Sequence, residues 1–209
     1  MVLYNYLRQN YGENTPILAS DLNFDSISAV NVRQQLKKLT DSGKLKRYAT
    51  GIYFIPAPSV FKSGSTISRE DVIEKKYLFE NGRRCGYFTG IAFANGINAT
   101  TQLPAAFEIV TNKLAAGVRK ITSSGTKLIL RSPKYTIDDN NYLALQFLDF
   151  IKEADILTEY DTENTSAIIA DYLQKSGIKF AQLEPFFDAY PLKLYKNLYK
   201  YGVLKNAAA

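Results

Sequence analysis

The sequence predicts an α+β fold: a small N-terminal domain of helices and one hairpin, then a mixed α/β domain with a small sheet and a helical C-terminal part. Residues 15–56 contain short helical patterns separated by turn residues and end in a basic two-stranded hairpin. Residues 86–131 contain one short helix of small residues, followed by a buried strand and a hairpin. From residue 141 onward, apolar residues recur at helical spacing.

The composition excludes several classes of protein. The 209 residues suffice for two small domains, and an apolar content of 46% is normal for a packed globular chain. The sequence has no run of roughly 18 apolar residues that would span a membrane and no signal-peptide pattern. The single cysteine, Cys85, excludes an internal disulfide and is typical of a reducing compartment. We therefore expect a cytoplasmic protein without a membrane partner.

The net charge of +6 is unevenly distributed along the chain. Residues 1–60 carry seven basic and four acidic side chains, residues 61–136 carry twelve and five, and residues 137–209 carry seven and eleven. The basic first and middle parts of the chain indicate a polyanionic partner. Lysines that are simply solvated would give the same charge balance.

Two helices are predicted near the N-terminus. The first covers Val2–Tyr11, where apolar side chains four residues apart share one face. Thr15 is predicted as an N-cap and is followed by Pro16 at the first helical position, where the missing N–H has no effect. This pair predicts a short second helix over Ile17–Leu22.

The third helix, predicted over Ser28–Ser42, has an apolar stripe that includes Val32 and Leu36. At 100° per residue, Gln34 lies opposite that stripe and the basic side chains flank it. Amides bind adenine edges, valine contacts a thymine methyl group, and Lys and Arg neutralise phosphates. An ordinary amphipathic helix would show the same polar face. The helix residues predicted to contact DNA are Ser28, Val30, Asn31, Arg33, Gln34, Lys37 and Lys38.

A hairpin is predicted directly after this helix, with strands over residues 44–48 and 52–55 and Pro56 at its end. Its basic first strand would place Lys44, Lys46 and Arg47 on the DNA backbone. Three helices followed by a basic hairpin are typical of a winged helix-turn-helix, so residues 1–58 are predicted to bind double-stranded DNA. Winged helices also bind other proteins, which remains the alternative.

Residues 57–66 are rich in Pro, Ser and Gly, and residues 59–66 are predicted to be a linker to a second domain over residues 67–209. Ser68 and Asp71 indicate a capping-box start for the next helix. The other predicted elements are a short helix over Ile91–Asn95, a strand over Phe107–Thr111, a hairpin of residues 118–122 and 126–131 turning at Ser123–Gly125, and helices over Tyr142–Ile151, Ser166–Gln174, Ala181–Phe187 and Pro191–Tyr201.

No motif for catalysis is specific in this sequence. It contains no phosphate-binding loop, no nucleophile-elbow motif and no histidine to activate Cys85. We therefore expect no enzyme activity, no cofactor and no bound metal. One alternative is a metal-dependent nuclease centre built on Glu108, with Lys113 or Lys127 nearby.

Two segments carry a family resemblance. The hairpin ends in Gly-Ile-Tyr-Phe-Ile-Pro over 51–56. The middle of the chain contains Tyr-Phe-Thr-Gly-Ile-Ala-Phe-Ala-Asn-Gly over 87–96, Thr-Gln-Leu-Pro over 101–104 and Val-Thr-Asn over 110–112. Together they resemble the AbiEi family of antitoxins from type IV toxin–antitoxin and abortive-infection loci of bacteria.

The resemblance implies a transcriptional repressor that binds inverted repeats in the promoter of its own operon. It also implies that the second domain counteracts a nucleotidyltransferase-like toxin without forming a stable complex with it.

Overall fold

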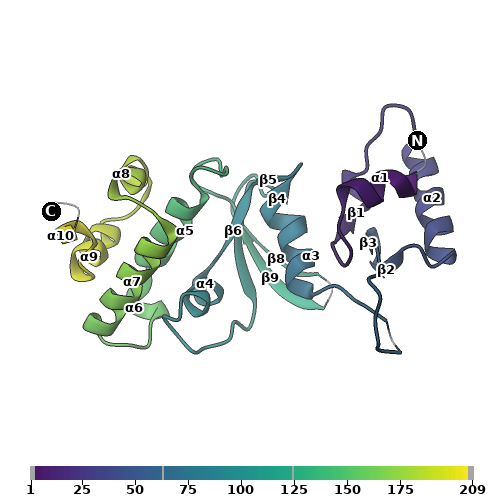
Figure 1. The fold of residues 1–209 in the computed structure, drawn as a ribbon. Helices are drawn as coiled ribbons and strands as arrows, with labels where there is room; N and C mark the ends of the chain where they lie inside the picture. The colour runs from purple at the N-terminus through teal and green to yellow at the C-terminus, as the bar shows by residue number, and fades with distance from the viewer. Residues whose placement is uncertain (1–2, 63, 124, 207–209) are drawn as a thin grey trace. The chain divides into compact units, whose positions relative to one another are not determined.

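The computed structural model describes residues 3–62, 64–123 and 125–206, and is mixed α+β. The chain divides into two compact units, residues 1–76 and residues 77–209 (Figure 1). Val2 and Ser124, which belong to predicted elements, lie outside the described residues.

Two helices frame the core of the N-terminal unit. Helix α1 (Leu3–Asn10) turns Leu3 and Leu7 inward, as its spacing predicts. Helix α2 (Ala29–Asp41) buries Val32 and Leu36, and all four side chains belong to one apolar cluster. Ser28 caps α2, because its hydroxyl accepts a hydrogen bond from the Asn31 N–H at 3.3 Å. The third predicted helix is therefore confirmed.

The predicted helix over Ile17–Leu22 is wrong. Ile17 and Leu18 form a short strand, β1, and a single 3₁₀ turn, η1, follows it over Ala19–Asp21. The strand pairs with Ile52 and Tyr53 of the hairpin. A six-residue helix gains too few backbone hydrogen bonds to repay its nucleation, whereas the strand gains a partner and buries both side chains.

The predicted hairpin is present as β2 (Lys46–Ala49) and β3 (Ile52–Phe54). With β1 it forms an antiparallel sheet in the order β1-β3-β2. A register shift between Arg47 and Ala49 precedes the turn, where Gly51 has a φ of +74° that favours glycine.

The N-terminal unit continues past the hairpin and includes residues 59–66, the predicted linker. Helix α3 (Arg69–Ile73) follows, and Ser68 and Asp71 cap it reciprocally, as predicted. One π-helical turn, η2 (Glu74–Leu78), continues this helix into the second unit.

The second unit opens with two short paired strands, β4 (Phe79–Glu80) and β5 (Arg83–Arg84). A four-stranded sheet follows in the order β6-β7-β9-β8, in which β7 and β9 are parallel. The strand over Phe107–Thr111 and the hairpin are confirmed, whereas the first strand was not predicted. The strands of this sheet are β6 (Gly86–Thr89), β7 (Phe107–Thr111), β8 (Val118–Ser123) and β9 (Thr126–Arg131).

Helix α5 (Tyr142–Ile151) is the centre of the helical part, as its apolar sequence predicts. Phe147 and Phe150 are fully buried among the surrounding helices, while Leu145 packs with Tyr87 of β6. Among the described residues, no helix is long and apolar enough to cross a membrane. The remaining helical elements are α4 (Gly90–Gly96), α6 (Ala154–Leu157), α7 (Thr162–Ser176), α8 (Phe180–Leu183), η3 (Glu184–Ala189), α9 (Lys193–Lys200) and α10 (Val203–Asn206).

The C-terminal end of α5 depends on one buried amide. The Asn197 side-chain N–H group donates to the carbonyl oxygens of Ile151 at 2.8 Å and Lys152 at 3.2 Å. Replacing Asn197 by alanine leaves these carbonyls without that donor, so we expect the free energy of unfolding to fall by about 1–3 kcal/mol. Urea denaturation measures the loss. The neighbouring exposed variant Lys196→Ala is the control and should stay within about 0.5 kcal/mol of the native protein.

A second prediction concerns the loop after α4. The Glu159 carboxylate accepts hydrogen bonds from the Thr101 N–H and from the hydroxyls of Thr100 and Thr101, and these bonds hold its pKa below the usual range. A lowered folded-state pKa stabilises the protein above the unfolded pKa, roughly 4.3, and this contribution is lost as the pH falls through the folded pKa. The stability difference between Glu159→Gln and the native protein should therefore be largest at pH 7 and shrink as the pH falls below roughly 4.3. A difference that does not change with pH would contradict this role.

Candidate nucleic-acid interface

The predicted recognition residues lie on the exposed face of α2. Ser28, Asn31, Gln34 and Lys38 are all exposed, and Val30 exposes 59% of its surface although it is apolar. The apolar stripe points the other way, although Ala29 at the start of the helix is exposed and does not join it. Helix α2 therefore presents amides, a valine and basic side chains on one surface.

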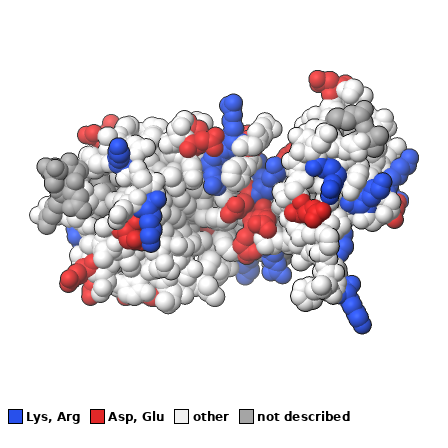
Figure 2. Space-filling view, viewed as in Figure 1, with Lys and Arg blue, Asp and Glu red and all other residues white. Residues whose placement is uncertain are grey.

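A groove separates α2 from the hairpin. Its volume is about 450 Å³, and it brings together Arg33 and Lys37 of the helix with Arg47 of β2. Its other lining residues, not predicted from the sequence, are Ala19, Thr40, Asp41, Thr50, Gly51 and Tyr53. Three predicted phosphate contacts thus line one groove. Figure 2 shows several Lys and Arg side chains on the visible face of the N-terminal unit, with acidic side chains beside them.

The basic side chains around this groove are held by local contacts. The Lys37 ammonium lies 3.1 Å from the Asp41 carboxylate, and both side chains are mostly exposed. The Arg47 guanidinium donates to the Ala49 carbonyl and to the Thr50 hydroxyl, at 3.4 and 3.2 Å. The Lys37 and Arg47 side chains that make these three contacts are exposed, so a phosphate can replace the contacts at small cost.

Two other residues predicted to contact the DNA backbone, Lys44 and Lys46, lie outside the groove. The Lys44 ammonium lies over the Tyr4 ring, 5.1 Å from its centroid. Lys46 is half-buried, and its ammonium donates to the Ser65 carbonyl at 3.2 Å. The sequence did not indicate this contact, because Lys46 and Ser65 are far apart in the chain and meet only in the folded unit.

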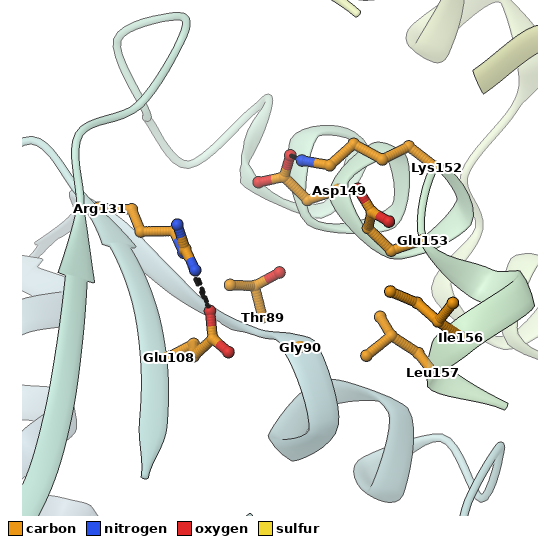
Figure 3. Close-up of a pocket in the computed structure, with 9 residues that line it drawn as sticks. All are labelled: Thr89, Gly90, Glu108, Arg131, Asp149, Lys152, Glu153, Ile156 and Leu157. Carbon is orange, nitrogen blue, oxygen red and sulfur yellow. Dashed lines mark hydrogen bonds and ion pairs between the residues drawn. The ribbon is translucent and has the colours of Figure 1, made fainter. Parts of the chain in front are cut away.

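Glu108, the residue of the alternative nuclease centre, lies in β7 and faces a cavity in the second unit (Figure 3). The Arg131 guanidinium donates two hydrogen bonds to one of its carboxylate oxygens, at 2.9 and 2.8 Å. Across the cavity, Asp149 accepts from the Tyr87 hydroxyl at 2.8 Å and from the Lys152 ammonium at 3.0 Å. Burial, and then the nearby Asp149, raise the pKa of Tyr87, which keeps the hydroxyl protonated as a donor.

These pairings do not favour a metal centre. Within the described ranges, no group of three or more Cys, Asp or Glu side chains is arranged to hold an ion. Glu108 and Asp149 each neutralise a neighbouring cation instead. The geometry therefore gives the nuclease alternative no support.

Comparison with known proteins identifies no family. No protein-family model matches the chain, and no curated protein matches it at a significant level. The resemblance to the AbiEi antitoxins therefore depends on the two motif segments alone.

The pairing of Glu108 gives a prediction about catalysis. We expect that duplex DNA incubated with the protein and Mg²⁺ or Mn²⁺ remains uncut, because the carboxylate is already engaged by Arg131. Gel electrophoresis after a long incubation measures cleavage. Metal-dependent cutting by the native protein that disappears in Glu108→Ala would contradict this prediction and restore the nuclease hypothesis.

Proposed function

We propose that the chain is a DNA-binding transcriptional repressor of the antitoxin type, in which the N-terminal unit binds double-stranded operator DNA. The observation that carries this proposal is the groove in which Arg33 and Lys37 of α2 meet Arg47 of the hairpin. The element order α1, β1, η1, α2, β2 and β3, with the sheet order β1-β3-β2, supports the winged helix-turn-helix interpretation of this unit.

The two sides of α2 would have different roles on DNA. Arg33 and Lys37, on the side of the hairpin, would contact phosphates and fix the register of the helix. Asn31 and Gln34 lie outside the groove, and their amides match the donor and acceptor pair that adenine shows in the major groove. Val30 would add an apolar contact for a thymine methyl group.

Fluorescence anisotropy with the chain's own upstream region tests the proposal. Arg33→Ala should weaken binding to operator and to random DNA alike and lower the salt slope by about one, because one phosphate contact is lost. Gln34→Ala should instead reduce discrimination between the two DNAs by about 1–3 kcal/mol.

Lys196→Ala, an exposed lysine on α9 of the other unit, is the matched control and should bind both DNAs as the native protein does. Binding that ignores salt, or that survives both α2 variants, would overturn the proposal. Co-purification of a partner protein that Val30→Ala releases would then favour the alternative, a protein-binding winged helix.

The antitoxin part of the proposal derives from the family resemblance. In this proposal, residues 77–209 counteract a nucleotidyltransferase-like toxin encoded beside this chain, without a stable complex. Growth of cells that express both proteins measures antitoxicity. The full chain carrying Arg33→Ala and Gln34→Ala should still rescue growth, because these residues belong to DNA binding. Loss of rescue in this variant, with the folded protein present, would contradict the division of roles.

A further inference from the structure

One face of the four-stranded sheet is covered over two strands and open over the other two. Val110 pairs with Tyr87 and with Arg131, so these three side chains point to the same side of the sheet. Helix α5 covers this side over β6 and β7, where Tyr87 and Val110 pack with Leu145. Over β9 and the edge strand β8 the same side is exposed or half-buried (Figure 1). We call this part the open face; its residues are Val118, Lys120, Thr122, Lys127 and Ile129.

Two lysines lie close together on the open face. Lys120 is directly opposite Ile129, and Lys127 precedes Ile129 by two residues on β9, so all three point to the same side. Residues in this diagonal relation have Cα atoms about 7–8 Å apart. A hollow of about 450 Å³ lies beside both lysines. Its other lining residues are Ala106, Ile121, Thr122, Leu128 and Ile129.

The charges of Lys120 and Lys127 are not neutralised within the part of the chain that the structure describes. Both side chains are exposed, and neither has a partner among the described residues. Arg131, on the same side of the sheet, is engaged instead, because it binds Glu108. Residues 118–131 contain four basic side chains and no acidic one. The open face therefore has a positive potential that attracts anions.

The chemistry of the open face favours the phosphates of a duplex. Lysine binds phosphate as a point charge, and two lysines on an open surface suit successive phosphates of a polyanion better than one small anion. Proteins that bind single strands stack the bases on aromatic side chains, and none of the described residues that line the hollow is aromatic.

We propose that Lys120 and Lys127 bind the phosphate backbone of duplex DNA, so that the second unit adds contacts of its own to those of the N-terminal unit. Such contacts strengthen binding to every duplex by the same factor and leave the discrimination between sequences unchanged. The choice of DNA as the polymer rests on the proposed function, whereas the basic open face does not depend on it.

Salt titrations of the full chain with a random-sequence duplex test the proposal by fluorescence anisotropy. Lys120→Gln and Lys127→Gln should each lower the slope of log affinity against log salt by about 0.9, because each removes one phosphate contact. The ratio of operator affinity to random-duplex affinity should stay at the native value in both variants. Both positions are exposed, so the melting temperature should not change.

Arg119→Gln is the matched control. Arg119 precedes Lys120 on β8 and is also exposed, but alternation along the strand places it on the opposite side of the sheet. The variant removes the same charge from the same strand and should keep the native salt slope. An equal fall of the slope in all three variants would indicate a net-charge effect and overturn the assignment to the open face.

Two other results would overturn the proposal. A native slope in both lysine variants would exclude the contacts, and would leave the proposed function intact if Arg33→Ala still lowers the slope. Tighter binding of a single strand or of duplex RNA than of duplex DNA of the same length would exclude DNA as the partner. Lower slopes in the lysine variants, together with native binding in Arg33→Ala and Gln34→Ala, would support this inference and overturn the proposed function.

Discussion

The pairing of β1 with β3 is the contact on which the N-terminal unit depends. Ile17 and Leu18 are adjacent in the strand and therefore point to opposite faces of the sheet. Ile17 belongs to the apolar cluster that includes residues of α1 and α2. Leu18 belongs to a second apolar cluster, which contains Ile67 and residues of the hairpin. Two residues thus join both apolar clusters of the unit. A polar residue at position 17 would weaken the core and displace the proposed DNA surface together.

Helix α5 has the corresponding role in the second unit. Its apolar residues enter two clusters, one shared with the surrounding helices and one shared with Tyr87 and Val110 of the sheet. Because both sides are buried, Asp149 on the remaining side of the helix faces the cavity, together with Lys152 directly after the last residue of α5. The same packing that stabilises the unit therefore positions one wall of this cavity.

The elements that were predicted correctly carry their own local signals. Helix α2 has a capping serine and a periodic apolar stripe, and α5 is a long apolar segment, so each is specified by neighbouring residues. Strand β1 consists of two residues whose partners lie on β3, and no local pattern reports that pairing. The functional residues follow the same rule, because only those with a local sequence signal could be predicted. Exposure of Gln34 follows from helical spacing, whereas the hydrogen bond between Tyr87 and Asp149 depends on how β6 and α5 meet.

The groove of the N-terminal unit and the cavity of the second unit also differ in how firmly their side chains are held. The Lys37–Asp41 pair has side chains 79% and 62% exposed, so its contribution is at most about 1 kcal/mol and a phosphate can displace Asp41. Side chains that exchange partners easily suit a flexible polyanion such as DNA, along which the protein must find its binding register. In the cavity, Asp149 is 11% exposed and held by both Tyr87 and Lys152, and a pair of this kind is costly to break.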